Sequence, residues 1–464
     1  MQTNKLKTGD FIMKNLRVFL SSENKRFEEQ SANYAKTYSR KEFDPSLWGE
    51  NIIIRPEEEY QEIHGFGASF TDTAAIVMSE MPKDKLEDTM IHLFDKKDGI
   101  GLSLIRNCLG GSDFTPQYYT YDDMPDGEED WELKHFDFSH DLKQIIPLTK
   151  WAKEINPDIL FFLSPWTAPL WMKDKPCWKS KDHPVLRKEC YDVYAKYMAK
   201  AIQCYEEQGL PIYAMTVQNE PFAHLNWTGM FMDEEALISL TNDYLRPTLD
   251  EAGIHTKILN LDYNTCYAKR GIKIMEATKD TTDGLAYHWY NGPSNWAKEA
   301  LDLYPEKLFY VTEASSDNPD TTQKLVHITT EIAKYLRMGM HGFIMWNMAL
   351  DHSGGPTFEN INTHCSGLLS CNTDTKEITY TKDFYALAHY SKFIRQGAKR
   401  IYATDTTVMN PKMVNLVAKN PDGSLTAVMV NGDEDDKTCR FVIDDEVTEI
   451  IVPSQGVATV HWEV

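Results

Sequence analysis

The sequence lacks the long apolar runs and the short ligand motifs that mark several classes of protein. None of its apolar stretches approaches the roughly 20 residues that span a bilayer, and its N-terminal region never reaches the roughly 7–15 apolar residues of a signal peptide. It contains no HExxH, GxSxG or Walker motif, no clustered Cys/His set, and no convincing GxGxxG after a strand. We therefore expect no membrane span, no metal and no cofactor, and we expect a cytoplasmic location.

Positive charge is also scarce. The 464 residues include 48 Lys and Arg against 70 Asp and Glu, which gives a net charge of −22. Such an excess repels nucleic acid phosphates and acidic headgroups, so neither nucleic acid nor a membrane is an expected partner. The eight cysteines form no CxxC pair, which is typical of free thiols in a reducing compartment. The sequence leaves the oligomeric state open.

What the sequence does contain is a series of eight short apolar runs, each ending in polar or aromatic residues. Continuous apolar character is typical of strands covered on both faces, and the intervening segments are typical of helices. The clearest helix is 188–209, which has apolar residues at helical spacing and ends at Gly209. Strand and helix alternating eight times predict an α/β protein with a (β/α)8 TIM barrel. The runs are 64–70, 102–107, 159–166, 212–220, 257–263, 284–290, 308–315 and 342–348.

The pattern changes after about residue 390. Five strand-like runs follow, separated by turn sequences such as NPDG (420–423), and this is typical of antiparallel β structure. Residues 16–22 and 51–56 are also strand-like and have no helices beside them, so we expect them to pair with the C-terminal strands in a β-sandwich side domain built from both termini. The expected segments are 1–58 and 392–464 for the side domain and 59–391 for the catalytic barrel.

Two glutamates lie at the ends of barrel strands, where the active sites of such barrels are found. The fourth run ends with Asn219 and Glu220, and the seventh ends with Glu313. A single glutamate could be a helix N-terminal charge or an ion-pair partner, but two of them at one barrel mouth favour catalysis. Cleavage of a glycosidic bond needs one carboxylic acid to protonate the leaving oxygen and one carboxylate facing the oxocarbenium-like carbon.

Aromatic and polar residues at the other strand ends are candidates for binding the sugar. Aromatic faces cover the C–H faces of a pyranose, and a few polar groups fix its hydroxyls. We interpret His288 as a hydrogen-bonding residue rather than a proton carrier, since two glutamates already supply the proton transfers. The candidates are Asp113, Trp166, His288, Tyr290 and Trp346.

Other residues have two readings that the sequence does not separate. Asp72 stands where a helix begins, so it is either an N-cap or a sugar contact. Three further tryptophans are either rim or core aromatics: Trp171, Trp178 and Trp227. The acidic and aromatic insertion 115–138 either shapes the rim of the site or extends into solvent.

Six motifs occur in an order that resembles glycoside hydrolase family 30, the family of lysosomal glucosylceramidase and bacterial β-glycosidases. The motifs are HGFGASFTD, SPWTAPLWMK, TVQNEP, HWY, VTEAS and WNMALDHSGGP. The resemblance implies a retaining mechanism with Glu220 as general acid/base, Glu313 as nucleophile and Asn219 at the 2-hydroxyl of the sugar. It also implies that Asp113, Trp166 and Trp346 grip the nonreducing sugar, as in the glucose-specific branch.

These observations predict a retaining, exo-acting β-glucosidase whose substrates are small soluble β-glucosides. The alternatives within the family are an endo-β-1,6-glucanase, a glucosylceramidase or a β-xylosidase. A catalytically silent sugar-binding barrel is the non-enzymatic alternative. The segment 357–371 departs from the glucosylceramidase pattern, so that either Asn360 or Asn362 could take the sugar-binding place.

Overall fold

The computed structural model describes residues 14–44 and 49–463. The first 13 residues, where we expect no signal peptide, lie outside the described residues, as do 45–48 and 464 of the expected side domain. Eight parallel strands form the predicted barrel, which closes where β12 pairs with both β5 and β11. The strands are β5 (Gly65–Phe70), β6 (Leu104–Leu109), β7 (Leu160–Pro165), β8 (Ile212–Thr216), β9 (Lys257–Asn264), β10 (Gly284–His288), β11 (Leu308–Glu313) and β12 (Gly342–Asp351).

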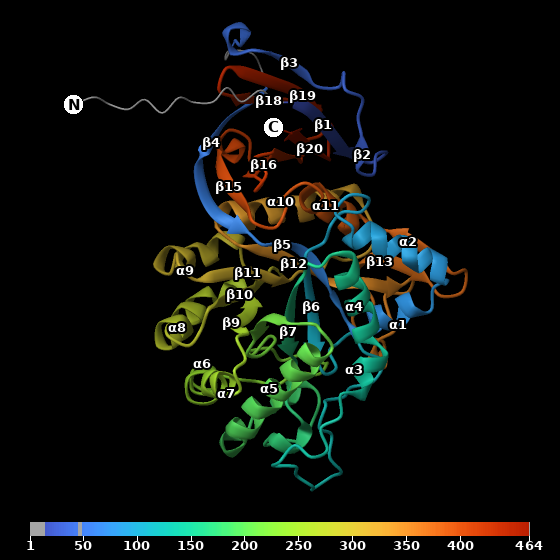
Figure 1. The fold of residues 1–464 in the computed structure, drawn as a ribbon, viewed down its shortest axis with the longest axis vertical. Coiled ribbons are helices and arrows are strands. Elements are labelled where there is room, and N and C mark those ends of the chain that lie inside the picture. The colour runs from blue at the N-terminus through green and yellow to red at the C-terminus, as the bar shows by residue number, and fades with distance from the viewer. Residues whose placement is uncertain (1–13, 45–48, 464) are drawn as a thin grey trace, which may run out of the picture.

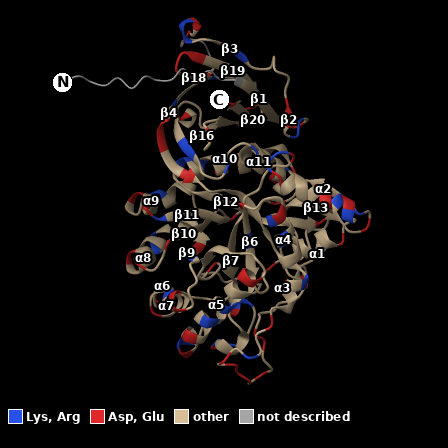
Figure 2. Cartoon of the chain, viewed as in Figure 1, with Lys and Arg blue, Asp and Glu red and all other residues tan. Residues whose placement is uncertain are grey.

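Helices follow the strands and cover the outside of the barrel (Figure 1). The predicted helix at 188–209 is α5 (Tyr191–Glu207), preceded by a short 3-10 turn. Charged residues lie on these helices, on the loops and on the side-domain strand β4 (Glu50–Ile63), whereas the barrel strands carry few (Figure 2). Among the described residues, no helix is both long and apolar enough to cross a bilayer. The other helices are α1 (Asp72–Ser79), α2 (Lys83–Phe94), α3 (Ser139–Lys143), α4 (Ile145–Ile155), α6 (Glu234–Ser239), α7 (Arg246–Glu251), α8 (Ala268–Thr278), α9 (Lys298–Leu303), α10 (Thr322–Met338) and α11 (Lys382–Ser391).

The side domain combines both ends of the chain, as predicted from the sequence. The blue and red ribbons of the two ends lie together on one side of the barrel (Figure 1). Val18 of β1 pairs with Val460 of β20, and Ile63 of β4 pairs with Ala398 of β15. The strands are β1 (Lys14–Ser21), β2 (Glu28–Glu29), β3 (Lys36–Ser39), β4 (Glu50–Ile63), β15 (Ala398–Ala403), β16 (Met413–Lys419), β17 (Leu425–Asn431), β18 (Lys437–Ile443), β19 (Glu446–Val452) and β20 (Gly456–Glu463).

Two features join the domains. Strand β4 runs from the side domain directly into the start of the barrel, and α10 and α11 pack between the barrel and strands β16, β17 and β20. A hairpin after β12, formed by β13 (Gly367–Asn372) and β14 (Glu377–Tyr380), extends the barrel sheet. The boundaries after residues 58 and 391 remain our proposal for dividing the chain. All eight cysteines lie in described residues and are free.

A layer of apolar side chains fills the barrel interior. Its members come from seven strands and are fully buried or nearly so, as in barrels whose inward-facing side chains stack in layers. They are Leu104, Phe162, Ala214, Leu259, Ala286, Tyr310 and Ile344. This layer forms the floor on which the polar side chains at the barrel mouth rest.

Candidate active site

The polar layer of the site lies directly above the apolar layer because side chains alternate along a strand with a period of two. Arg106 lies two residues beyond Leu104 on β6, and His288 lies two residues beyond Ala286 on β10. The same step on other strands reaches Ser164, Thr216, Thr312 and Trp346. All six of these side chains are buried. The apolar layer is thus followed, two residues further along each of these strands, by a layer that is mostly polar.

An irregularity in β9 brings a carboxylate into this layer. Ala286 of β10 pairs with Leu261, and the next residue of β10 pairs with Tyr263, so Asp262 is an extra residue in β9. Leu261 and Asp262 both have positive φ angles, of 71° and 44°. Bulges of this kind re-aim side chains and are common beside active sites. Here the bulge points Asp262 at Arg106.

Arg106 is the centre of the buried network. Its Nη1 donates to Oε2 of Glu313 at 2.7 Å, and its Nη2 donates to Oδ1 of Asn219 at 2.7 Å and to Oδ2 of Asp262 at 3.0 Å. The side chain of Arg106 is wholly buried. Burial alone would lower the pKa of Arg106, but the carboxylates of Asp262 and Glu313 hold it above its usual value. One guanidinium therefore fixes residues from three other strand ends.

Glu220 is held in an uncommon backbone conformation just beyond β8. Its φ angle is +46°, which few non-glycine residues adopt and which clusters at functional sites. The turn is held from both sides, because Asn219 N donates to Pro165 O at 2.8 Å and Glu220 N donates to Asp262 O at 3.0 Å. The Pro221 that follows disfavours the right-handed helical region for Glu220. The Glu220 side chain is 12% exposed and faces the cavity.

Glu313 faces Glu220 across the mouth. Besides the bond from Arg106, it accepts a hydrogen bond from the Tyr290 hydroxyl to Oε1 at 3.0 Å. A carboxylate oxygen of Glu313 lies within 4.8 Å of one of Glu220. Carboxyl groups about 5–5.5 Å apart are found in retaining glycosidases, whereas inverting enzymes need about 6.5–9.5 Å. The arrangement therefore suits a retaining reaction.

His288 lies between the carboxylates and is fully buried. Its Nδ1 is 3.2 Å from Oε1 of Glu220, and its Nε2 is 3.2 Å from Oδ1 of Asp262. Burial would lower the pKa of His288, but the nearby carboxylates, Glu313 first among them, raise it to about 10. Burial raises the pKa of Glu220, and the hydrogen bond from His288 opposes that rise only in part. His288 thus contacts Glu220 from behind and is absent from the cavity wall.

The inner end of the cavity is built from Trp166, Trp346 and Asp113. The two indole rings stack with centroids 5.0 Å apart and are almost fully buried. Asn362, from the loop after β12, donates to Oδ2 of Asp113 at 3.0 Å. Burial, together with the charges of Glu313 and Glu220, raises the pKa of Asp113 to about 8. At neutral pH Asp113 is therefore mostly protonated and can donate a hydrogen bond.

These side chains line a cavity of about 810 Å³. Seven of the eight sequence-predicted site residues lie on its wall, namely Asp113, Trp166, Asn219, Glu220, Tyr290, Glu313 and Trp346. The eighth, His288, lies behind it. Trp227 and Asn362 are also on the wall, whereas Trp171, Trp178, Asn360 and every residue of 115–138 are not.

Asp72 has a different place from either sequence reading. The N-cap of α1 is Thr71, whose side chain accepts from the backbone N of Ala74. Asp72 is buried and accepts a hydrogen bond from Thr115 at 2.8 Å, and its other oxygen lies 2.9 Å from His140 Nε2. It therefore fixes the loop after β6 and does not reach the cavity.

Two central residues, Arg106 and Asp262, were not among the sequence candidates. Arg106 is the one charged residue of the apolar strand run LSLIRN, and Asp262 lies within the run KILNLDY, whose other charge, Lys257, stands at its start. Since a buried charge needs a partner, an arginine in one such run and an aspartate in another were a usable signal. The β9 bulge that brings Asp262 to Arg106 cannot be recognised from any pattern in the sequence.

We predict that replacing Arg106 with Met destabilises the protein by about 3–5 kcal/mol, because it removes the guanidinium that pairs with the buried carboxylates of Asp262 and Glu313. Urea unfolding of the variant and the wild type measures the change. Lys196→Met is the control, since Lys196 pairs with Asp192 on the exposed face of α5 and its loss should cost at most about 0.5 kcal/mol. Equal stability of the two variants would contradict the role given to Arg106.

Comparisons with known proteins agree with this geometry. Residues 63–394 match the model of the glycosyl hydrolase family 30 TIM-barrel domain, and residues 397–460 match that of the family 30 β-sandwich domain. Lysosomal acid glucosylceramidase of Mus musculus is 28% identical over 444 residues, covering 89% of this chain and 83% of that protein. An endo-1,6-β-D-glucanase of Trichoderma harzianum is 28% identical over 403 residues, covering 83% and 81%. A solved endo-β1,6-glucanase superposes with a TM-score of 0.86 at 28% identity, covering 97% of this chain and 99% of that one.

Proposed function

This chain belongs to glycosyl hydrolase family 30, and from that premise we propose that it is an exo-acting β-glucosidase that releases single glucose units from small β-glucosides. The observation that carries the exo-action is the closed inner end of the cavity. There Trp166 and Trp346 are almost fully buried, and Asn362 reaches across to Asp113. We infer that a terminal sugar binds against these buried residues, so that the substrate extends only toward the leaving-group side.

The proposed reaction has two steps. In the first, a carboxylate oxygen of Glu313 bonds to the anomeric carbon while Glu220 gives its proton to the glycosidic oxygen, and the bond to the aglycone breaks. In the second, Glu220 takes a proton from water, which attacks the anomeric carbon and frees Glu313. The raised pKa of Glu220 suits the acid role, since it keeps the proton available closer to neutral pH.

The remaining wall residues are proposed to bind the glucose ring. Asn219, oriented by Arg106, is placed to contact the 2-hydroxyl, where hydrogen bonds strengthen in the transition state. Trp166 and Trp346 offer apolar surface to the C–H groups, and the protonated Asp113 is a donor to a hydroxyl far from the reacting carbon. Tyr290 orients Glu313, and His288 orients Glu220 from behind.

Endo-β-1,6-glucanase activity is the second candidate, and one feature of the cavity favours it. From Glu313 the wall continues along residues 315–319 to the start of α10 at Gln323, Lys324 and His327. We infer that this second arm can receive sugar units on the leaving-group side. Two of the relatives above carry endo-1,6-glucanase in their names. Endo-action would, however, require that the inner end open to accept a chain.

We predict that gentiobiose, a β-1,6-linked disaccharide, is hydrolysed with a higher kcat/KM than either long β-1,6-glucan or micellar glucosylceramide at one salt concentration. The inner end is expected to admit only a terminal glucose, and the net charge of −22 provides no attraction toward a lipid surface. Product analysis over time measures the mode of attack. Glucose as the first product of the polymer supports exo-action, whereas early oligosaccharides or a preference for the lipid would overturn it.

A cytoplasmic location also remains a prediction, to be tested by cell fractionation.

A further inference from the structure

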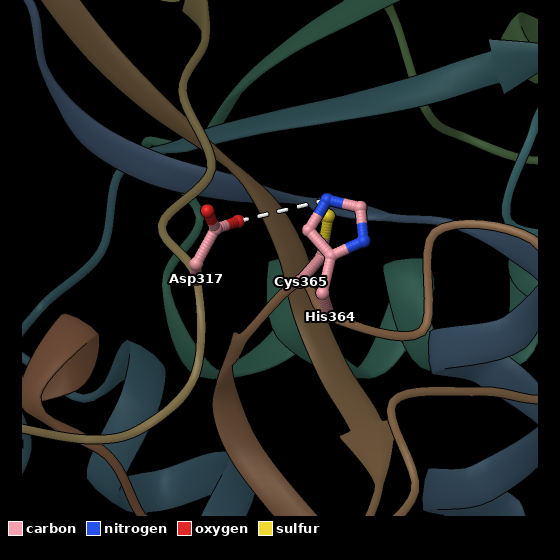
Figure 3. A group of neighbouring side chains, drawn as sticks. All are labelled: Asp317, His364 and Cys365. Carbon is pink, nitrogen blue, oxygen red and sulfur yellow. Dashed lines mark ion pairs between the residues drawn. The ribbon is translucent and has the colours of Figure 1, made fainter.

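Asp317, His364 and Cys365 form a cluster of three metal-ligating groups outside the catalytic network. One ligand atom of each residue lies within 4.8 Å of the other two. Figure 3 shows the carboxylate of Asp317 directed toward the imidazole of His364, with the Cys365 sulfur beside the ring. The carboxylate Oδ1 is 3.7 Å from Nε2 of His364. The reaction proposed above uses none of the three.

The backbone beneath the cluster is fixed by hydrogen bonds between two loops. Asp317 and Cys365 stand opposite each other in an antiparallel bridge. On either side of the bridge, Ser366 N donates to Ser316 O at 2.8 Å and Asn318 N donates to His364 O at 2.9 Å. Opposed residues in such a pair project to the same side. The carboxylate and the thiol are therefore held near each other by the main chain, although the Asp317 side chain itself is exposed.

From this geometry we propose that Asp317, His364 and Cys365 bind a Zn²⁺ ion at the rim of the cavity. Thiolate, imidazole and carboxylate are the ligands that zinc selects, and three protein ligands leave a fourth position for water or substrate. Bond lengths of about 2.0–2.3 Å in a tetrahedron place ligand atoms roughly 3.3–3.8 Å apart. The imidazole nitrogen and the carboxylate oxygen, 3.7 Å apart, are slightly farther from each other than the roughly 3.3–3.5 Å expected of a nitrogen and an oxygen ligand. The exposed side chains of Asp317 and His364 can complete the site by small rotations.

The position of the site places the bound ion where it can affect hydrolysis. All three residues line the cavity that also contains Glu220 and Glu313. The single Lys or Arg among the described lining residues is Lys324, whose ammonium is paired with Asp383 at 2.6 Å. Among the described residues, no unpaired Lys or Arg of the cavity wall therefore lies beside the cluster to repel a divalent cation. An ion at the rim narrows the path of the leaving group, so zinc binding should inhibit hydrolysis reversibly.

Co²⁺ is a spectroscopic probe of the same site that does not depend on activity. Titrating the intact protein with Co²⁺ should produce a near-ultraviolet thiolate-to-cobalt absorption band that Zn²⁺ then removes. Cys365→Ser should abolish the band. His364→Asn should weaken Co²⁺ binding by at least about tenfold, since even outer-sphere partners of metal ligands are worth 10–100-fold. Cys204→Ser is the control, because this partly exposed free thiol lies on α5 and should leave the band intact.

Inhibition gives the second measurement. Zn²⁺ should lower the rate of aryl β-glucoside hydrolysis, EDTA should restore it, and the concentration for half-inhibition should rise at least about tenfold in Cys365→Ser relative to that variant's own uninhibited rate. No cobalt band, or a band that persists in Cys365→Ser, overturns the proposal. Unchanged inhibition in Cys365→Ser also overturns it and places the ion at Glu220, His288 and Glu313 instead. Loss of glucosidase activity alone would leave the cobalt result standing.

Discussion

Replacing Glu313 with Ala is expected to lower kcat on an aryl β-glucoside by on the order of 10⁴–10⁶-fold. The reason is that the variant has no carboxylate to bond to the anomeric carbon, although Arg106 and Tyr290 still surround the vacated position. Steady-state kinetics measures the loss. A 2-deoxy-2-fluoro β-glucoside with a good leaving group should also label the wild type covalently, and peptide mass spectrometry should place the label on Glu313.

Glu299→Ala is the matched control for this experiment. Glu299 is an exposed glutamate that pairs with Lys269 on the outside of the barrel, far from the cavity wall. Its removal should leave kcat within about a factor of two, since exposed ion pairs contribute little. A label found on any residue other than Glu313, or a Glu313→Ala variant with near-normal kcat, would contradict the nucleophile assignment.

The sequence was sufficient for the fold because each barrel strand is a continuous apolar run and each connection carries a helical pattern. The composite side domain was also predictable. Residues 16–22 and 51–56 are strand-like but have no helices beside them, so they were expected to pair with the C-terminal strands. Glu220 and Glu313 could be found because they stand at the ends of such runs, where a barrel places its active site. These inferences depend only on local patterns and on the rules of one architecture.

Other parts of the site depend on tertiary structure that no local pattern specifies. Asp262 reaches Arg106 only through an extra residue in β9, and the shift in register appears only when β9 pairs with β10. Asn362 and Asn360 both have positive φ angles in one loop, and only the path of that loop brings Asn362 to Asp113. Likewise, His288 ends a strand as the candidates do, but its ring is enclosed by three carboxylates from other strands.

Replacing Glu220 with Ala is expected to slow hydrolysis by on the order of 10²–10⁴-fold for substrates with poor leaving groups, because the variant cannot protonate the glycosidic oxygen. Substrates whose leaving group needs no proton should lose much less in the first step. The pH profile provides an independent measurement. Since Glu220 must be protonated to act, kcat/KM of the wild type should fall as pH rises through its raised pKa, and that fall should vanish in the variant. A separate fall near pH 8 should remain and be removed by Asp113→Asn.

Azide distinguishes the two glutamates by the product that each variant forms. In Glu220→Ala, Glu313 still forms the glycosyl-enzyme on one face of the sugar, so azide attacks from the opposite face and yields a β-glucosyl azide. In Glu313→Ala, azide takes the place of the missing carboxylate and yields an α-glucosyl azide. Product stereochemistry by NMR therefore tests both roles at once. The same anomer from both variants, or no rescue of Glu220→Ala on an activated substrate, would refute the assignment of Glu220 as acid/base.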